Sequence, residues 1–268
     1  MGRRVVFIVL DGLRYDAARA CLGFMEALVA AGEAQVYQVI SELPSLSRPL
    51  YATLLTGKPP VDHGIVGNAD VRRLACPNLF SLARKVGLTS AAAAFWWWSE
   101  LYNDAPFHPS HRLTERADRD IQHGLFYWSD EYPGDHTFAD ANALIERASP
   151  DFVLVHPSNI DDAGHKHGGD SVGYRNAVRA SSAHLSNFVP GWRARGYTIV
   201  VTSDHGMHAD GQHGGPTDGE TQVPFYTVGD AFTFNPEVTV RQIEVAGILC
   251  SLLGIENHGL AVPKGLLR

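Results

Sequence analysis

Residues 199–215, IVVTSDHGMHADGQHGG, combine a strand signal with a group of candidate metal ligands. The segment begins with residues 199–201, an apolar β-branched run that is typical of a buried strand. Asp204 and His205 follow this run, and His213 comes eight residues after His205 in a glycine-rich loop. A carboxylate beside an imidazole, with a second imidazole close by, suits zinc or a similar divalent ion. On this segment alone, a polar strand end with ordinary loop histidines is an equal alternative.

The length and composition favour one globular domain. A chain of 268 residues can form a single α/β domain with a large core, and we predict one domain over residues 1–268. The net charge of −7 leaves no basic surface signal, so we expect no nucleic acid polymer as a partner. A single phosphate ester remains a possible ligand, because bound metal ions would supply local positive charge.

The cysteines and apolar runs bear on the compartment. Cys21, Cys76 and Cys250 show no C-x-x-C spacing, which argues against a disulfide framework and against cysteine-ligated zinc. The first apolar run, residues 5–10, ends at Asp11 and is too short for a signal sequence or a membrane span. No later run reaches spanning length. We therefore expect a cytoplasmic protein that does not contact a membrane.

Apolar runs alternate with helical stretches along most of the chain. The predicted strands are residues 5–10, 35–40, 89–94, 151–155, 197–202 and 223–228. The predicted helices are residues 15–31, 51–56, 79–86, 171–195 and 240–253, with an interruption of the fourth at Pro190 and Gly191. This alternation predicts an α/β fold, with a mostly parallel central sheet and helices on both faces.

Residues 95–136 break the alternation and are rich in aromatic side chains. They include Trp96, Trp97, Trp98, Tyr102, Phe107, Phe126, Tyr127, Trp128 and Tyr132. We interpret the segment as a small aromatic-rich cap, inserted in the domain and folded over the site. The alternative is that most of these rings fill an outlying part of the core.

Four polar segments fall at or just after predicted strand ends, where open α/β sheets bind ligands. They contribute Asp11, Ser47, the pair Asp161 and His165, and the opening segment 199–215. Asp161 and His165 are four residues apart and can converge on one ion, with Asp162 as the rival carboxylate. A serine just before a helix can lie where the helix dipole favours an anion, or it can be a simple N-cap.

In this order, the segments resemble the alkaline phosphatase superfamily and, within it, the type I phosphodiesterase/nucleotide pyrophosphatase family. The matching pieces are VLDGLR (9–14), LPSLSRPLYATLLTGKPPVDHGIVGN (43–68), IDDAGHKHGGDSVGYR (160–175), TSDHGM (202–207) and HGG (213–215). The resemblance implies an alkaline-phosphatase-like fold and a metal-dependent phosphohydrolase of the phosphodiesterase/nucleotide pyrophosphatase type. It also implies two divalent metal ions, expected to be zinc, and a small-molecule phosphoester substrate.

The resemblance assigns a role to each candidate residue. The first metal site would comprise Asp11, Asp204 and His205 with Ser47, and the second would comprise Asp161, His165 and His213. Ser47 would be the nucleophile, activated by the first metal, and would form a phospho-serine intermediate. Asn68 would hydrogen-bond a phosphoryl oxygen.

Several features restrict this interpretation. Ser47 stands where many family members have threonine, and Leu50 stands where larger relatives often have asparagine. The interval between His205 and His213 is short, whereas it is long in the large extracellular nucleotide pyrophosphatases, so nucleotide specificity does not follow. Tyr51 replaces the arginine of the sulfatase modification motif, which argues against a sulfatase.

Two alternatives to a phosphodiesterase stay open. One is a phosphomonoesterase or phosphonate hydrolase with the same site, and the other is a non-catalytic metal-binding module. The side chain of Arg48, beside the nucleophile, is expected to point away from substrate. The histidines without ligand-like spacing are His63, His108, His111, His123, His136, His156, His184 and His258.

Overall fold

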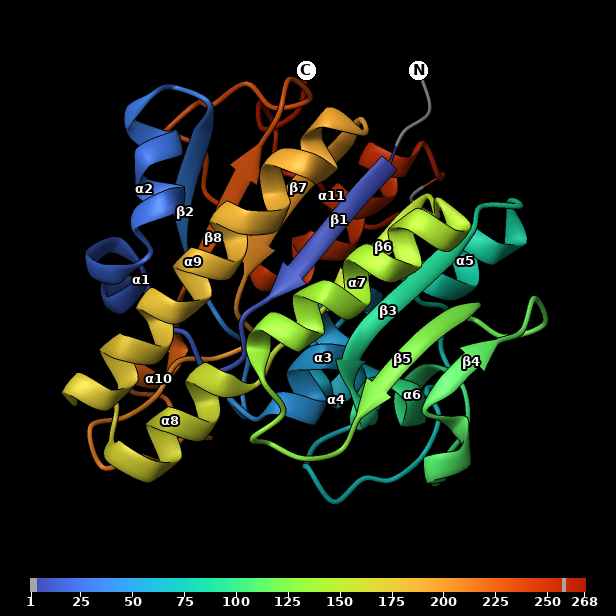
Figure 1. Ribbon diagram of the computed structural model, residues 1–268, viewed down its shortest axis with the longest axis horizontal. Helices are drawn as coiled ribbons and strands as arrows, with labels where there is room; N and C mark the ends of the chain where they lie inside the picture. The colour runs from blue at the N-terminus through green and yellow to red at the C-terminus, as the bar shows by residue number, and fades with distance from the viewer. Residues whose placement is uncertain (1–3, 257–258) are drawn as a thin grey trace.

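The computed structural model describes residues 4–256 and 259–268, and the strands of this part form one eight-stranded sheet (Figure 1). Its order is β2-β8-β7-β1-β6-β3-β5-β4. The strands are β1 (Arg4–Val9), β2 (Ala34–Ile40), β3 (Ser90–Phe95), β4 (Leu113–Glu115), β5 (His123–Tyr127), β6 (Phe152–Val155), β7 (Tyr197–Thr202) and β8 (Gln222–Val228). Met1 and His258 lie outside the described residues.

The central strands β7, β1, β6, β3 and β5 run parallel to one another. β8 is antiparallel to both β7 and β2, and β4 is antiparallel to β5. The prediction of a mostly parallel α/β sheet is therefore confirmed, with reversed strands near both edges. The carboxyl ends of the central strands meet at one edge of the sheet, which is where the candidate ligands lie.

Helices cover both faces of the sheet (Figure 1). One face packs against α1 (Tyr15–Cys21), α2 (Gly23–Ala30), α7 (Gly134–Ala148) and α9 (Val172–Ala194). The other packs against α3 (Ser47–Thr56), α5 (Leu79–Lys85), α6 (Trp96–Tyr102) and α11 (Val245–Leu253). The short helices are α4 (Pro60–His63), α8 (Asn159–His167), α10 (Asp218–Thr221), η1 (Pro109–His111) and η2 (Gln242–Glu244).

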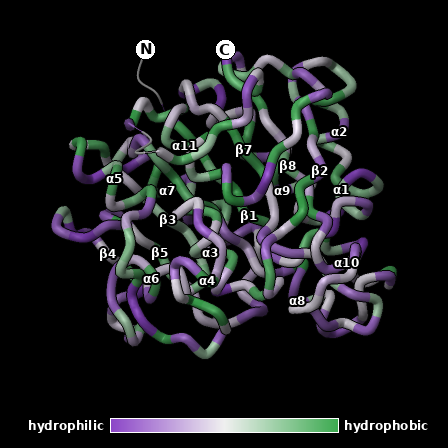
Figure 2. Tube along the Cα trace, turned by 180° about the vertical axis from the view of Figure 1, so that it is seen from behind, coloured by the Kyte–Doolittle hydropathy of each residue, from purple (hydrophilic) through white to green (hydrophobic). Residues whose placement is uncertain are grey.

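The two faces of the sheet form two separate hydrophobic clusters. Along β1, Val5 and Phe7 point into one cluster, while Val6 and Ile8 point into the other. Seen from behind, Figure 2 shows hydrophobic stretches along the central strands and hydrophilic ones in many outer loops. In the described part of the chain, no helix combines the length and apolarity needed to cross a membrane.

Three predicted helices differ from the observed ones. Residues 15–31 form two helices, because Leu22 leaves the helical region with ψ of 58°. Residues 240–253 begin with a short 3-10 turn before α11. The predicted break at Pro190 is wrong, since α9 runs through it. Buried side chains on both sides of this exposed proline, including Leu185 and Trp192, hold the helix and offset the lost backbone hydrogen bond.

The predicted cap over residues 95–136 is divided between two places. Its strands β5 and β4 extend the central sheet beside β3, so this part is not a separate insertion. Trp98 is fully buried in the core. The end of β3, the start of α6 and the turn after β5 line the cavity beside the candidate site, through Phe95, Trp96, Trp97, Trp128 and Asp130. A lid role for these segments stays a prediction.

Candidate functional site

The sheet order brings the three candidate carboxylates together. Asp11 and Asp204 each come two residues after a strand end, and the last residues of those strands, Val9 and Thr202, are paired in register. Asp161 lies on α8, which follows β6 on the other side of β1. The parallel arrangement of β7, β1 and β6 therefore places the carboxylates at one edge.

Gly12 permits the close approach of β1 to α8. A side-chain carbon at this position would lie 2.9 Å from the Cα and Oδ1 atoms of Asp161. The backbone of Gly12 also has φ of +72°, a conformation that favours glycine. Gly12 is thus sterically required for the close approach of Asp161 to the end of β1.

His205 lies at the centre of the first predicted metal site. Its Nε2 atom is 3.4 Å from Asp11 Oδ1, 3.2 Å from Asp204 Oδ2 and 3.0 Å from Ser47 Oγ. All four side chains are buried. Ser47 is the first residue of α3, so its hydroxyl lies at the positive end of a helix dipole. The predicted first set is therefore assembled in one place.

Asp161, His165 and His213 are also brought together. His165 Nε2 lies 3.3 Å from Asp161 Oδ2, and His213 Nε2 lies 3.6 Å from Asp161 Oδ1. The two Nε2 atoms are 3.2 Å apart. His205 stacks on His213 with a centroid distance of 3.7 Å, so the two predicted sets are contiguous.

The backbone orients all three imidazoles. The Nδ1 atom of His205 is 2.8 Å from the carbonyl of Gly206. Likewise, His165 Nδ1 is 2.7 Å from the Gly211 carbonyl, and His213 Nδ1 is 2.9 Å from the Ser45 carbonyl. A carbonyl only accepts, so each Nδ1 is the donor and each Nε2 is the nitrogen available to a metal.

The carboxylates have the unsatisfied oxygens that a cation would occupy. Asp11 Oδ1, Asp161 Oδ1 and Asp204 Oδ2 are buried and have no hydrogen-bond partner within residues 4–256 and 259–268. Burial and the neighbouring carboxylates raise the pKa of Asp11 well above its ordinary value and that of Asp204 to about 7. Burial also opposes ionisation of Asp161. The hydrogen bond from His165 and the nearby imidazoles of His205 and His213 nevertheless hold the pKa of the Asp161 carboxyl below its ordinary value. Divalent cations would supply the missing charge, and this donor set fits zinc.

The grouping of possible ligand atoms differs in one respect from the prediction. The ligand atoms of Asp11, Asp204 and His205 lie within 4.8 Å of one another, as do those of Asp161, His205 and His213. His205 therefore lies within reach of both groups, while the partly exposed His165 lies at the rim of the second.

Asn68 is hydrogen-bonded to the backbone next to Ser47. Its Oδ1 atom accepts a hydrogen bond of 3.0 Å from the backbone N–H of Arg48, so its amide NH2 group remains the donor. Both Asn68 and Ser47 line a cavity of about 510 Å³ beside the carboxylates. An amide donor next to a hydroxyl suits a phosphoryl oxygen next to an attacking oxygen.

Two residues at the site were missed from the sequence. The Tyr51 hydroxyl donates to Asp11 Oδ2, and His156 Nε2 lies 3.1 Å from the same oxygen. His156 is fully buried, and burial lowers its pKa to about 3. The spacing of His156 to other candidate ligands did not indicate that it lies at the site. The signal was its position directly after a buried strand, which it shares with the predicted ligands.

The Arg48 side chain is hydrogen-bonded to the backbone of Asn68. Its Nε atom donates to the backbone carbonyl oxygen of Asn68 at 2.9 Å, and its Nη1 atom is 2.8 Å from Glu100 Oε2. The guanidinium also lies 4.5 Å from the ring centroid of Trp97. Arg48 and Glu100 are both 1% exposed, so this ion pair between α3 and α6 is buried.

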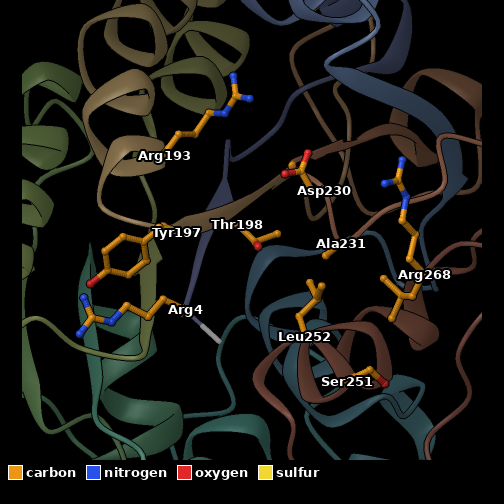
Figure 3. Close-up of a pocket in the computed structure, with 12 residues that line it drawn as sticks. Arg4, Arg193, Tyr197, Thr198, Asp230, Ala231, Ser251, Leu252 and Arg268 are labelled. Atoms are coloured by element: carbon orange, nitrogen blue, oxygen red, sulfur yellow. The ribbon is translucent and has the colours of Figure 1, made fainter. Parts of the chain in front are cut away.

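A second cavity, of about 530 Å³, lies at the opposite edge of the sheet (Figure 3). It is lined by Arg4 and Tyr197, at the amino ends of β1 and β7, and by Arg193 and Arg268. None of the candidate ligands lines it, so the candidate chemistry is confined to the carboxyl edge.

Known proteins resemble this chain in sequence and in fold. The profile of the type I phosphodiesterase / nucleotide pyrophosphatase family matches residues 5–213, which include every candidate ligand. Murine ectonucleotide pyrophosphatase / phosphodiesterase 5 is similar in structure, with a TM-score of 0.75 and 14% identity over 97% of both chains. A 2-O GAG sulfatase has a TM-score of 0.68 and 15% identity, over 96% of this chain and 71% of that chain.

The curated relatives are much longer proteins. The catalytic subunit of human GPI ethanolamine phosphate transferase 3 is 22% identical over 284 residues, covering 94% of this chain and 24% of the relative. That of human GPI ethanolamine phosphate transferase 2 is 21% identical and covers 97% and 27%, respectively. The chain thus spans about a quarter of the length of the curated relatives it matches.

Proposed function

The chain belongs to the type I phosphodiesterase/nucleotide pyrophosphatase family. We propose that it is a phosphoric ester hydrolase, and specifically a two-metal phosphodiesterase with Ser47 as nucleophile. The observation that supports this most strongly is the position of Ser47 Oγ, 3.0 Å from His205 Nε2. This hydroxyl lies beside a group of buried carboxylates with unpartnered oxygens. A serine hydroxyl in such a place is a candidate nucleophile rather than a simple helix cap.

We propose two zinc ions as the resident metals. Asp11, Asp204 and His205 would hold the first ion next to Ser47, and Asp161, His165 and His213 would hold the second. When bound, the ions would supply the charge that lowers the pKa of a hydroxyl and stabilises negative phosphoryl oxygens. Three protein ligands at each site leave an open position, as in catalytic rather than structural zinc sites.

The residues of the chain would divide the reaction between them. Ser47 Oγ would form a bond to phosphorus while the bond to the leaving alcohol breaks on the opposite side, giving a phospho-serine intermediate. The Asn68 amide would donate to a phosphoryl oxygen, and the positive end of α3 would favour the negative charge of the phosphoryl group. Water would then cleave the Ser47–phosphorus bond. Two in-line displacements give net retention at phosphorus.

The surroundings of the cavity support a diester rather than a monoester. A monoester has a second negative charge and needs additional positive groups. Apart from the candidate histidine ligands, the cationic side chain that lines the described cavity is Lys166. Its Nζ atom is already paired, at 2.6 Å from Glu131 and 3.0 Å from Asp162. A phosphomonoesterase or phosphonate hydrolase with the same site is the second candidate.

The test is a metal analysis combined with a panel of p-nitrophenyl esters: a phosphate diester, a monoester and a phosphonate. We expect two divalent ions per chain and the highest kcat/KM on the diester. Ser47→Ala should abolish turnover, while Ser47→Thr, which keeps a hydroxyl, should retain measurable activity. Full activity of Ser47→Ala would contradict the nucleophile, and no hydrolysis of any ester by the metal-loaded protein would contradict the enzyme.

A further inference from the structure

The two outer edges of the sheet differ in how they are protected (Figure 1). β4, at one end of the sheet, has only three residues, and its Glu115 is paired with Arg147. β2, at the other end, has seven residues and contains no charged side chain. A short, charged edge strand resists pairing with another chain, whereas a longer, uncharged one favours it. The edge of β2 is therefore the one open to a further strand.

The register shows which backbone groups of β2 face outward. Gln38 is opposite Pro224 of β8, which has no N–H to donate to it. The Pro224 carbonyl accepts a hydrogen bond of 2.8 Å from Thr202 Oγ1, on the side of β7. Gln38 and Pro224 therefore form a non-hydrogen-bonded pair, in which the backbone groups of each residue point away from the other. Gln38, and by alternation Ile40, present their N–H and C=O groups at the free edge.

An exposed apolar patch lies beside this edge. Ile40, Leu43 and Val61 are 54%, 49% and 79% exposed, and all three line a cavity of about 470 Å³. This cavity shares no lining residue with the cavity beside the candidate metal ligands. Large apolar side chains that gather on a surface are typical of a contact with another protein.

Two side chains of opposite charge border the same patch. Glu42 and Arg241 line the cavity, and within residues 4–256 and 259–268 neither side chain has an ion-pair partner. Their backbone N–H groups are bound to the side chains of Gln242 and Glu244, respectively. A partner with one sign of charge would pair with only one of the two. A second copy of this chain brings both charges, as a two-fold interface requires.

We propose that the chain forms a two-fold symmetric dimer in which the β2 strands of two copies pair antiparallel. The sheets of the two copies would then be continuous, and the outward backbone groups of Gln38 and Ile40 would gain partners. The apolar patches would cover each other. Glu42 of each copy would lie near Arg241 of the other.

The axis of the dimer should lie near Ile40, at the end of β2. Towards the start of the strand, the outward carbonyl of Val36 already accepts a hydrogen bond of 3.1 Å from Gln35 Nε2. The apolar patch, in contrast, lies at the end of the strand, with Leu43 just beyond it. Pairing about Ile40 buries this patch and leaves the start of β2 outside the centre of the interface.

The first test is the oligomeric state of the full chain. In sedimentation velocity over a series of micromolar concentrations, we expect a species of twice the mass of one chain, and its fraction should rise with concentration. Hydrogen exchange should slow in residues 36–41 as the dimer forms. A monomer at every concentration overturns the proposal, including the case in which a different protein covers the patch.

Two variants should separate the copies while keeping the fold. Gln38→Pro removes an outward N–H that β8 does not use, and Ile40→Lys places a charge in the apolar patch. Each should weaken the dimer at least about tenfold. The matched control is Leu113→Lys, a 52% exposed position on the opposite edge strand, which should dimerise as the wild type does. Urea unfolding checks that each variant is folded, and Ile40→Lys decides if Gln38→Pro is not.

A charge exchange tests the symmetry of the interface. Glu42→Arg and Arg241→Glu should each weaken the dimer about threefold, the range of an exposed ion pair, and the double variant should restore it. A dimer that Ile40→Lys leaves intact, or that Leu113→Lys disrupts, overturns the proposal. A double variant no tighter than the single ones overturns it as well. The candidate metal ligands all lie within one chain, so these results are independent of the proposed hydrolysis.

Discussion

Removing the negative charge of Glu100 tests whether the buried ion pair holds the site together. In Glu100→Gln the shape is kept, but the guanidinium of Arg48 loses its carboxylate partner at 2.8 Å in a region where both side chains are 1% exposed. Breaking such a pair from one side costs about 3–5 kcal/mol, because a buried charge is left without compensation. A domain of this size loses about 2–4 °C of melting temperature per kcal/mol.

The matched variants separate the ion pair from simple loss of packing. Arg48→Met removes the cation beside Glu100, whose Oε1 keeps the hydrogen bond from the Phe107 N–H, and should also destabilise the fold. The double variant Arg48→Met/Glu100→Gln should be less destabilised than the sum of the two. The assay is urea unfolding of each variant, with and without metal. A loss of less than about 1 kcal/mol in the free energy of unfolding of Glu100→Gln, the size of an ordinary exposed ion pair, would contradict a stabilising buried pair. Additive losses for the two substitutions would contradict it as well.

The same variants should also affect catalysis. Arg48 Nε donates to the backbone carbonyl oxygen of Asn68 at 2.9 Å. Arg48→Met removes this hydrogen bond, so Asn68 should be less well fixed, and with it the side-chain amide that we propose binds a phosphoryl oxygen. We expect kcat/KM to fall about tenfold or more, by comparison with the loss of one oxyanion donor, while metal content stays at the wild-type level. Unchanged kinetics in a folded, metal-loaded Arg48→Met protein would show that this hydrogen bond is irrelevant to the reaction.

The remaining predictions concern the metal sites. Chelation should lower the melting temperature, since a ligand at a hundred times its Kd contributes about 2.7 kcal/mol per site; an unchanged melting temperature would argue against resident metals. His156→Gln should weaken zinc affinity about 10–100-fold in a competition titration, because the imidazole lies 3.1 Å from Oδ2 of Asp11 and would orient the carboxylate whose Oδ1 we propose binds the metal; affinity equal to wild type would count against this role. Gly12→Ala should lower the free energy of unfolding by about 1–3 kcal/mol more than Gly32→Ala. Gly12 and Gly32 have the same φ of +72°, but an added side-chain carbon would meet Asp161 at Gly12 and nothing within 4 Å at Gly32. Equal losses in urea unfolding would refute the steric argument.

The sequence predicted the strands β1, β3, β6 and β7 and the proximity of the candidate ligands for one shared reason. β-branched and apolar runs identify buried strands, and in a parallel sheet the polar residues after such runs meet at one edge. Asp11 and Asp204 could therefore be placed together without any structure. The same rule applies to His156, which directly follows β6, although its spacing to the other candidate ligands does not indicate a shared site.

Long-range pairing could not be read from the sequence. Arg48 and Glu100 are 52 residues apart, and nothing in the local pattern of either indicates a buried partner. β5 was hidden in a polar and aromatic segment, and its pairing with the alanine-rich β3 depends on tertiary packing. The reversed direction of β8 relative to β7 is likewise a property of the assembled sheet, because local sequence does not encode strand direction.

The stereochemical course at phosphorus tests the central claim most directly. A single stereoisomer of a phosphorothioate diester would be hydrolysed by the metal-loaded protein in isotopically labelled water, and the configuration of the product would be determined. Attack by Ser47 followed by attack of water is a double displacement, so we predict retention of configuration. Inversion would mean that water attacks phosphorus directly, and it would contradict the assignment of Ser47 as nucleophile.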